Sequence, residues 1–314
     1  MTKVMANELT TIDLLWTGRP RSIAALLIQS AGKSALVDPG PQSTLETLRA
    51  EILKRGQNFQ TLDALLLTHI HLDHAGATGS IIRENPNLKV YVHEVGAPHM
   101  VDPSRLLASA GRLYGEELQT LYGETLPVPK ENLKSLRGGE RIQVGESQLD
   151  AFYTPGHASH HLTYWDRDSR TAFVGDTAGI RVQNEAFLLP ATPPPDIDVD
   201  IWNQSLDTIN SWKPERLFLT HFGFIEDPAH HIRRYKERLR EWTLLTRKLL
   251  ESGMETMEAE EAFVDEIASG IKSVLPSAAA DHYIFNGGLR LSWLGLMRYV
   301  RKQAQLGAFE SRRN

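Results

Sequence analysis

Thr68-His69-Ile70-His71-Leu72-Asp73-His74 is the stretch on which the interpretation of this chain depends. It follows an apolar run at 64–67 that predicts a buried strand, and it places four potential metal ligands within six residues. In an extended segment, side chains two residues apart point the same way, so His69 and His71 can share one ion. Asp73 and His74 begin a predicted helix and project differently, which leaves room for a second ion. Packing gives no reason to crowd such groups, so the cluster predicts a metal site.

The composition restricts which ligands could complete such a site. The chain has 314 residues and no cysteine, which excludes disulfides, thiolate zinc sites, iron–sulfur clusters and a cysteine nucleophile. Nitrogen and oxygen ligands remain, and twelve histidines are available. A formal net charge of −5 gives no reason to expect a nucleic acid partner.

Nothing in the sequence predicts contact with a membrane. The longest apolar run, at 23–28, has six residues, whereas a membrane helix needs about 20. The N-terminal stretch has no basic region followed by an apolar one, so we expect a cytoplasmic protein.

Short apolar runs alternate with amphipathic stretches up to about residue 225, which favours a layered α/β fold. The predicted strands are 23–29, 34–37, 64–67, 88–92, 148–153, 162–165, 171–174 and 217–219. Helices are predicted at 45–52, within an insertion at about 94–130 and at 202–209. A proline-rich segment at 177–198 and the insertion are candidate walls of a binding pocket.

The remainder of the chain, residues 226–314, predicts helices. Apolar stripes at helical spacing indicate three of them, near 232–249, 263–274 and 291–300. From Ile225 to Asn314 there are 14 Lys plus Arg against 13 Asp plus Glu, so this segment is almost neutral. We expect it to pack against the preceding part of the chain.

Three further motifs follow predicted strands: Thr154-Pro155-Gly156-His157, Phe173-Val174-Gly175-Asp176 and Phe218-Leu219-Thr220-His221. With the HxHxDH pattern at 69–74 and an early Asp38 in Val-Asp-Pro-Gly, their order over residues 20–225 resembles the metallo-β-lactamase superfamily. The resemblance implies a four-layer αβ/βα sandwich with a C-terminal helical extension. Residues 1–225 would be the catalytic domain, with the helical insertion at about 94–130, and residues 226–314 a helical region packed on it.

The resemblance also implies a ligand set for two divalent metal ions. His69, His71 and His157 would bind one ion, Asp73, His74 and His221 would bind the other, and Asp176 would bridge them. Asp38 would support the site without ligating. His161 matches a histidine often present in hydroxyacylglutathione hydrolases, so a supporting or substrate-polarising role competes with a structural one. Zinc suits these donors, and iron or manganese would also be accepted.

The expected reaction is hydrolysis of a small-molecule substrate by a metal-bridging hydroxide, with Asp73 or Asp176 orienting the nucleophile. Hydroxyacylglutathione hydrolases and acyl-homoserine lactonases share all seven ligands, which implies an ester, thioester or lactone substrate. The missing cysteine and the presence of Asp176 argue against a β-lactamase. A phosphodiesterase is the main hydrolytic alternative. A persulfide dioxygenase with one iron on His69, His157 and Asp176 is another, and a non-enzymatic, metal-stabilised scaffold is a third.

Other histidines and tyrosines carry weaker predictions. His160 follows His157 closely, as His161 does, but matches no position of the family pattern. His93, His99, His230, His231 and His282 match no motif, so a surface or core position is expected for them. Tyr114 and Tyr122 could contact substrate, although amphipathic packing also explains them. The oligomeric state is not determined by the sequence.

Overall fold

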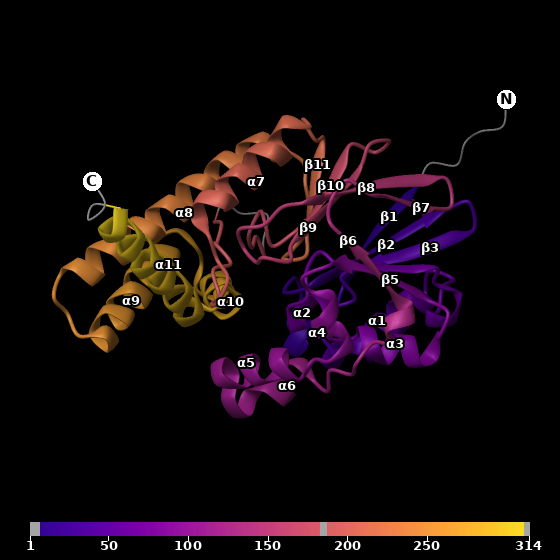
Figure 1. The fold of residues 1–314 in the computed structure, drawn as a ribbon, viewed down its shortest axis with the longest axis horizontal. Helices are drawn as coiled ribbons and strands as arrows, with labels where there is room; N and C mark the ends of the chain where they lie inside the picture. Colours follow the sequence, from indigo (N-terminus) through magenta and orange to yellow (C-terminus); the bar gives the residue numbers. More distant parts are fainter. Residues whose placement is uncertain (1–6, 183–186, 311–314) are drawn as a thin grey trace.

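The computed structural model describes residues 7–182 and 187–310 of the chain. Within these residues the strands form two six-stranded mixed sheets (Figure 1). The first sheet runs in the order β1 (Glu8–Asp13), β2 (Ala24–Ser30), β3 (Lys33–Val37), β4 (Ala64–Leu66), β5 (Lys89–His93) and β6 (Leu133–Leu136). The second runs from β12 (Gly223–Ile225) through β11 (Arg216–Leu219), β10 (Thr171–Gly175), β9 (Leu162–Asp166) and β8 (Ser147–Tyr153) to β7 (Arg141–Val144).

Helices cover the outer face of each sheet (Figure 1). Those associated with the first sheet are α1 (Leu45–Leu53), α2 (Leu72–Ala75), α3 (Thr78–Glu84), α4 (Ala97–Val101), α5 (Ser104–Tyr114) and α6 (Leu118–Tyr122). Those associated with the second are α7 (Val199–Ser211), α8 (Pro228–Glu251), α9 (Thr256–Val274), α10 (Ser277–Gly287) and α11 (Leu289–Glu310). Short 3₁₀ helices are η1 (Trp16–Gly18), η2 (Gln42–Thr44), η3 (Phe59–Thr61), η4 (Gly115–Glu117) and η5 (Lys130–Asn132).

The alternation of side chains along β2 shows why the sheets are sandwiched between helices. Leu26 and Ile28 point into an apolar core between the two sheets, whereas Ala25 and Leu27 point into the core under α1–α6. Successive side chains of a strand face opposite sides, so a strand that is apolar throughout needs cover on both faces. Three apolar cores in four layers result, and the predicted four-layer sandwich with a C-terminal helical region is confirmed.

All eight predicted strands are present, with ends shifted by at most a few residues. Four more strands, β1, β6, β7 and β12, were not predicted. In β7 buried and exposed residues alternate over only four positions, and β12 has three residues. Such short segments acquire their strand conformation from a neighbour in the sheet.

The C-terminal segment contains four helices in the described residues, so the prediction of three was wrong. The additional helix is α10, which lies between the second and third predicted helices. It ends at Gly287, and Gly288 has a φ of 49°, which separates it from α11. Its sequence, Ser-Ala-Ala-Ala-Asp-His-Tyr-Ile-Phe-Asn-Gly, has no long apolar stripe and therefore lacked the periodic signal.

The helical segment shares one apolar core with the second sheet. Ile232 and Leu239 of α8 belong to the same cluster as Leu217 and Leu219 of β11. β12 ends at Ile225 and α8 begins at Pro228, but a separate domain from residue 226 stays a prediction. Among the described helices, none has both the length and the apolar character needed to cross a membrane.

Candidate metal centre

The seven predicted ligands come together where the ends of strands from both sheets meet. The first sheet contributes four, all after β4: His69, His71, Asp73 and His74. The second contributes one after each of β8, β10 and β11: His157, Asp176 and His221. The site is therefore assembled from residues as far apart as 69 and 221 in the chain.

Two of these ligands follow a glycine that no other residue could replace without a clash. A Cβ on Gly156, whose φ is 137°, would lie 2.3 Å from the Cα of Trp202. A Cβ on Gly175, whose φ is 47°, would lie 2.4 Å from the Thr68 hydroxyl oxygen. Glycine adopts such backbone angles and permits such approach at little cost. The Gly-His and Gly-Asp pairs thus deliver His157 and Asp176 to the centre.

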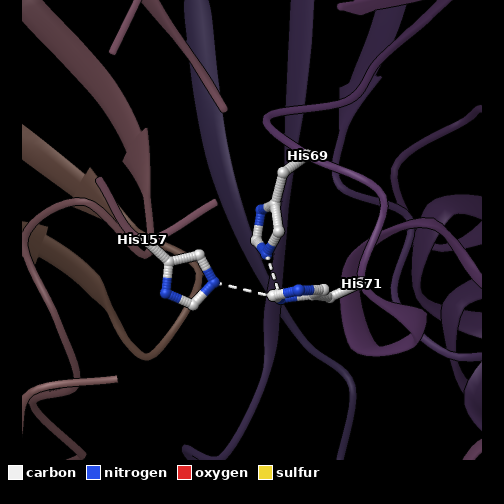
Figure 2. Close-up of side chains that lie close together, drawn as sticks. All are labelled: His69, His71 and His157. Carbon is white, nitrogen blue, oxygen red and sulfur yellow. Dashed lines mark hydrogen bonds between the residues drawn. The ribbon is translucent and has the colours of Figure 1, made fainter. Parts of the chain in front are cut away.

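The first group of donor atoms consists of three imidazole nitrogens. Figure 2 shows the rings of His69 and His157 directed toward His71. Nε2 of His69 lies 2.9 Å from Nδ1 of His71, and Nε2 of His157 lies 3.0 Å from the same atom. Nitrogens that share a tetrahedral zinc ion at ~2.0–2.1 Å lie roughly 3.3 Å apart, so the spacing suits one ion.

The second group joins a carboxylate to two imidazoles. Oδ2 of Asp73 lies 3.3 Å from Nε2 of His221 and 3.8 Å from Nε2 of His74. This mixed oxygen and nitrogen set is of the type that zinc, iron and manganese accept.

Asp176 lies between the two groups. Its Oδ1 is 3.2 Å from Nε2 of His74 and 3.5 Å from Nε2 of His221, whereas its Oδ2 is 3.6 Å from Nε2 of His157. The two oxygens of one carboxylate thus face different groups of donors, the arrangement needed to bridge two ions.

Hydrogen bonds on the far side of two rings orient their donor nitrogens inward. Nδ1 of His157 donates to the carbonyl of Ala191 at 2.7 Å, and Nδ1 of His221 donates to the carbonyl of Ser22 at 2.7 Å. Each carbonyl requires the proton on Nδ1, which leaves the lone pair of Nε2 free for a cation.

Asp38, fully buried at the end of β3, connects the ligand segments that follow β4 and β11. Its carboxylate accepts from the Thr68 backbone N–H at 2.8 Å, the Thr68 hydroxyl at 2.7 Å and the Thr220 hydroxyl at 2.8 Å. It also lies 2.8 Å from Nδ1 of His74. Thr68 precedes His69 and Thr220 precedes His221, so Asp38 contacts the supports of the centre and none of its donor nitrogens.

The first group of ligands is suited to bind a cation because its rings are neutral. Burial lowers the pKa of His71 to about 4, and the neighbouring His157 adds to this effect. Burial also lowers the pKa of His157 and that of His69. At neutral pH each ring therefore keeps a free lone pair.

The second group carries negative charge that a cation would balance. Burial raises the pKa of Asp73, but His74 and a hydrogen bond from His221 outweigh it and lower that pKa to about 2. Burial lowers the pKa of His74, yet the carboxylates of Asp176, Asp73 and Asp38 outweigh this and raise it well above its usual value. Three carboxylates around one buried ring favour positive charge at this place.

Two buried atoms in the centre have no hydrogen-bond partner, Nε2 of His74 and Oδ1 of Asp176. Unpartnered buried polar atoms are costly, because each has lost its contacts with water. Both face the region shared by the two groups of donors, and a divalent ion there would satisfy them. The residues therefore fit a metal centre.

His161 lies behind this centre. It is fully buried, its Nε2 accepts from the Asp176 backbone N–H at 3.3 Å, and its Nδ1 lies 3.1 Å from the Thr177 hydroxyl. It thus contacts the backbone that carries Asp176 and is not among the residues that line the cavity described next. The geometry favours the supporting role over the substrate-polarising one.

A cavity of about 630 Å³ opens beside the centre. Four of the predicted ligands line it: His71, Asp73, Asp176 and His221. Its other walls come from α5 and α6, from the proline-rich segment at 191–196, and from the end of α10 and the start of α11. The volume lies in the range of roughly 300–1,000 Å³ typical of small-molecule sites.

Several residues without a motif line this cavity. Tyr114 and Tyr122 do so, together with His99 and His160. The His160 ring centroid lies 5.7 Å from that of His71, and its Nδ1 is buried without a hydrogen-bond partner. Proximity of His160 to His157 in the chain was the only signal that could have placed it here.

The remaining histidines have structural contacts or lie at the surface. His93 is buried and stacks on Tyr153, and His231 is buried with Nε2 2.9 Å from the carbonyl of Ala178. His230 is exposed, and Nε2 of His282 lies 3.5 Å from the Ser22 hydroxyl.

Comparison with known proteins finds a matching family model and relatives of similar sequence. A family model described as "Metallo-beta-lactamase superfamily" matches residues 18–221. The chain is 28% identical over 167 residues to the metallo-beta-lactamase fold-containing protein ST1585 of Sulfurisphaera tokodaii, covering 52% of this chain and 62% of that protein. It is 29% identical over 156 residues to a hydroxyacylglutathione hydrolase of Legionella pneumophila, covering 49% and 46%. These matches thus span about half of this chain and less than two thirds of each relative.

A solved structure extends the similarity of fold beyond the matched segment. The metallo-beta-lactamase family protein TTHA1429 of Thermus thermophilus superimposes with a TM-score of 0.65 at 20% identity, over 95% of this chain and 94% of that one. The similarity in fold therefore includes the C-terminal helices.

Proposed function

The chain belongs to the metallo-beta-lactamase superfamily, and on that premise we propose that it is a metal-dependent hydrolase that uses two divalent ions to cleave an ester, thioester or lactone. The observation that carries this proposal is the arrangement of seven donor side chains in two groups joined by Asp176. A single ion would leave one of these buried groups unused. His69, His71 and His157 would hold one ion, and Asp73, His74 and His221 the other.

Ions held at these residues would lower the pKa of a bound water and polarise a carbonyl oxygen. The protein itself provides the entrance, because His71, Asp73, Asp176 and His221 line the cavity whereas His69 and His157 stand behind them. A substrate therefore reaches the centre from the cavity side.

Asp73 is best placed to hold the proton that leaves the attacking water. Its side chain is 24% exposed and faces the cavity, whereas that of Asp176 is 6% exposed. Oδ2 of Asp73 is near His221, which leaves Oδ1 able to accept a hydrogen bond from water. Asp176 would mainly hold the two groups of ligands in register.

The substrate class rests on the residues and on the relatives together. The Legionella relative is named a hydroxyacylglutathione hydrolase, and a Bacillus subtilis relative, 28% identical over 157 residues, is named a probable metallo-hydrolase. Carbonyl substrates also suit a centre where carboxylates orient water beside two groups of cation ligands.

Metal analysis combined with a substrate panel tests the proposal. We expect two zinc ions per chain after reconstitution, and hydrolysis of at least one member among p-nitrophenyl esters, S-lactoylglutathione and homoserine lactones. One iron per chain with persulfide-dependent oxygen uptake and no hydrolysis would favour the dioxygenase alternative. A preference for bis-p-nitrophenyl phosphate would favour the phosphodiesterase.

Asp73→Ala tests the proposed role of that carboxylate. We expect kcat to fall by about 10²–10⁴-fold, the usual contribution of a positioned acid or base. Asp168→Ala is the matched control, because Asp168 is exposed in the turn between β9 and β10. Full activity of Asp73→Ala with two ions bound would refute the role.

A further inference from the structure

The cavity beside the metal centre is closed partly by the C-terminal helices. Phe285 and Gly287 at the end of α10, and Leu291 in the first turn of α11, line it together with residues of α5 and α6. The same cavity is lined by Asp73 and Asp176, so a substrate held at the metal centre can extend to this wall.

An aromatic cluster forms part of that wall and joins three segments that are distant in the sequence. The ring of Trp16 lies with its centroid 5.8 Å from Tyr122 of α6 and 5.5 Å from Phe285 of α10. Tyr114 lies 4.9 Å from Tyr122, edge to face. Trp16 also donates from Nε1 to the carbonyl of Leu121 at 2.7 Å, so its ring is held in place. Such contacts make the wall rigid as well as apolar.

Apolar side chains that are only partly buried complete the wall. Leu106 and Leu113 face the cavity from α5, Leu121 from α6 and Leu291 from α11. Each leaves apolar surface in contact with water inside the cavity. Covering that surface is favourable in proportion to the area removed from water, so the wall prefers an apolar ligand group.

The charges beyond the metal centre do not suit a polyanionic substrate. Arg105 is the one arginine or lysine among the described residues that line the cavity, and it is opposed by Glu117 and Asp196. One positive charge against two negative ones gives no attraction for a carrier with several phosphates or carboxylates.

We propose that the cavity binds an uncharged alkyl chain of the substrate between α5–α6 and the junction of α10 with α11. This inference rests on the proposed function, since the ester, thioester or lactone bond would lie at Asp73 while the chain extends along the apolar wall. The junction of α10 with α11 is thereby a specificity-determining element. The chain can be the acyl part or the alcohol or thiol part of the substrate.

Two homologous series of substrates test the inference on the metal-loaded enzyme. One series is p-nitrophenyl acetate, butanoate, hexanoate and octanoate, and the other is n-alkyl acetates of the same chain lengths. We expect kcat/KM to rise at least about ten-fold from the shortest to the longest member of one series, since each buried methylene favours binding about four-fold at most. The series that shows the rise identifies which part of the substrate the wall holds.

A variant of the wall separates binding from general damage. Leu291→Ala is expected to reduce the ten-fold rise to about three-fold or less. Leu244→Ala is its control, because Leu244 is 51% exposed on α8 and does not line the cavity, and it should keep the full rise. Circular dichroism checks that both fold, and Leu291→Met, which conserves volume, should restore most of the rise.

Binding of 1-octanol supplies a measurement that does not need catalysis. Calorimetry on the metal-loaded protein should show binding with a negative heat-capacity change, the sign of apolar burial, and weaker binding to Leu291→Ala. Equal kcat/KM across both series together with no octanol binding would overturn the inference and leave the proposed hydrolysis intact. Octanol binding without hydrolysis of any ester, thioester or lactone would instead refute the proposed function alone.

Discussion

The two walls of the cavity differ in how the amino-acid sequence encodes them. The metal-centre wall is built from residues whose chemical identity matters, and each is marked in the sequence by a short motif that follows a strand. The opposite wall, formed by Trp16, Tyr114, Tyr122, Phe285 and Leu291, has no motif and comes from three distant segments. Coordination needs particular atoms, whereas an apolar wall needs only volume and apolar character. Substitutions at the two walls should therefore have different consequences.

The largest effect is expected from Asp176→Asn, which keeps the shape of the side chain and removes its charge. The two carboxylate oxygens of Asp176 face both groups of donors, so the change should weaken binding of both proposed ions. We expect kcat/KM to fall at least about 10³-fold for every substrate, since metal ions contribute several kcal/mol to such reactions. Metal content by mass spectrometry should fall as well. Unaltered metal content and activity would remove Asp176 from the bridging position.

A smaller effect on the same wall is expected from Asp38→Asn. Asparagine tolerates the left-handed backbone at this position, where φ is 48°, but it accepts fewer hydrogen bonds than a carboxylate. His74 and the two threonines that precede His69 and His221 lose part of their support. We expect metal affinity, measured by competition with a chelator, to fall about 10–100-fold. An unchanged affinity would show that Asp38 serves folding only.

Phe285→Ala tests the contribution of the opposite, apolar wall. Removing this ring opens the aromatic cluster at Trp16 but leaves every predicted ligand in place. In the substrate series that shows the rise with chain length, we expect kcat/KM for the eight-carbon ester to fall about five- to ten-fold and that for the two-carbon ester to fall about two-fold, with metal content unchanged. Equal losses for both esters would show that Phe285 affects every substrate alike, as the residues of the metal-centre wall do.

The smallest effect is expected far from both walls, at the ion pair between Arg49 of α1 and Glu84 of α3. Both carboxylate oxygens of Glu84 accept from the guanidinium at 2.7 Å, and this pairing lowers the pKa of Glu84. A depressed folded-state pKa stabilises the protein above the unfolded-state pKa of about 4.3, and the stabilisation is lost as pH falls through the folded-state value.

Glu84→Gln should therefore reduce the free energy of unfolding by no more than about 1 kcal/mol at pH 7, because the pair is partly exposed. The difference from the parent protein in urea unfolding should shrink as pH falls below 4.3. Glu116→Gln, at an exposed position in η4, is the control. A difference that grows toward low pH would contradict the assignment.

The parts of the fold that were predicted are those with a strong local signal. The strand before His69 is continuously apolar, and α8 has an apolar stripe from Ile232 to Leu249, so both were predicted. α10 was not, because its apolar residues do not recur at regular spacing. β6, β7 and β12 were not predicted, because three or four residues carry too little pattern. β1 has six residues, but its sequence Glu-Leu-Thr-Thr-Ile-Asp is mostly polar and has only one buried position, so it was not predicted either.

Within the candidate site, the motif residues were predicted, and so were two walls of the cavity, the insertion at about 94–130 and the proline-rich segment at 177–198. The histidines that line the cavity without a motif were not. His157 and Asp176 follow glycines that the close approach of Trp202 and Thr68 requires, so their motifs have a structural cause that the sequence displays. His99 and His160 line the same cavity without any such signal, and His160 differs from its neighbour His161 only in the direction it faces. Composition and spacing cannot show which of two adjacent histidines at the end of a loop faces the cavity.

By itself the sequence predicted the donor side chains of the metal centre, because the spacing at 69–74 indicated four of them and the resemblance of three later motifs to the metallo-β-lactamase superfamily implied His157, Asp176 and His221. The absence of cysteine excluded thiolate ligands. Only the tertiary structure decided which residues meet across the cavity. Trp16, Tyr122 and Phe285 come together because two sheets and the C-terminal helices pack in a particular order, and the partners of an apolar side chain are chosen by shape and proximity. Dispersion and the hydrophobic effect are non-directional and do not require particular partner residues, so the sequence alone does not show which apolar side chains meet.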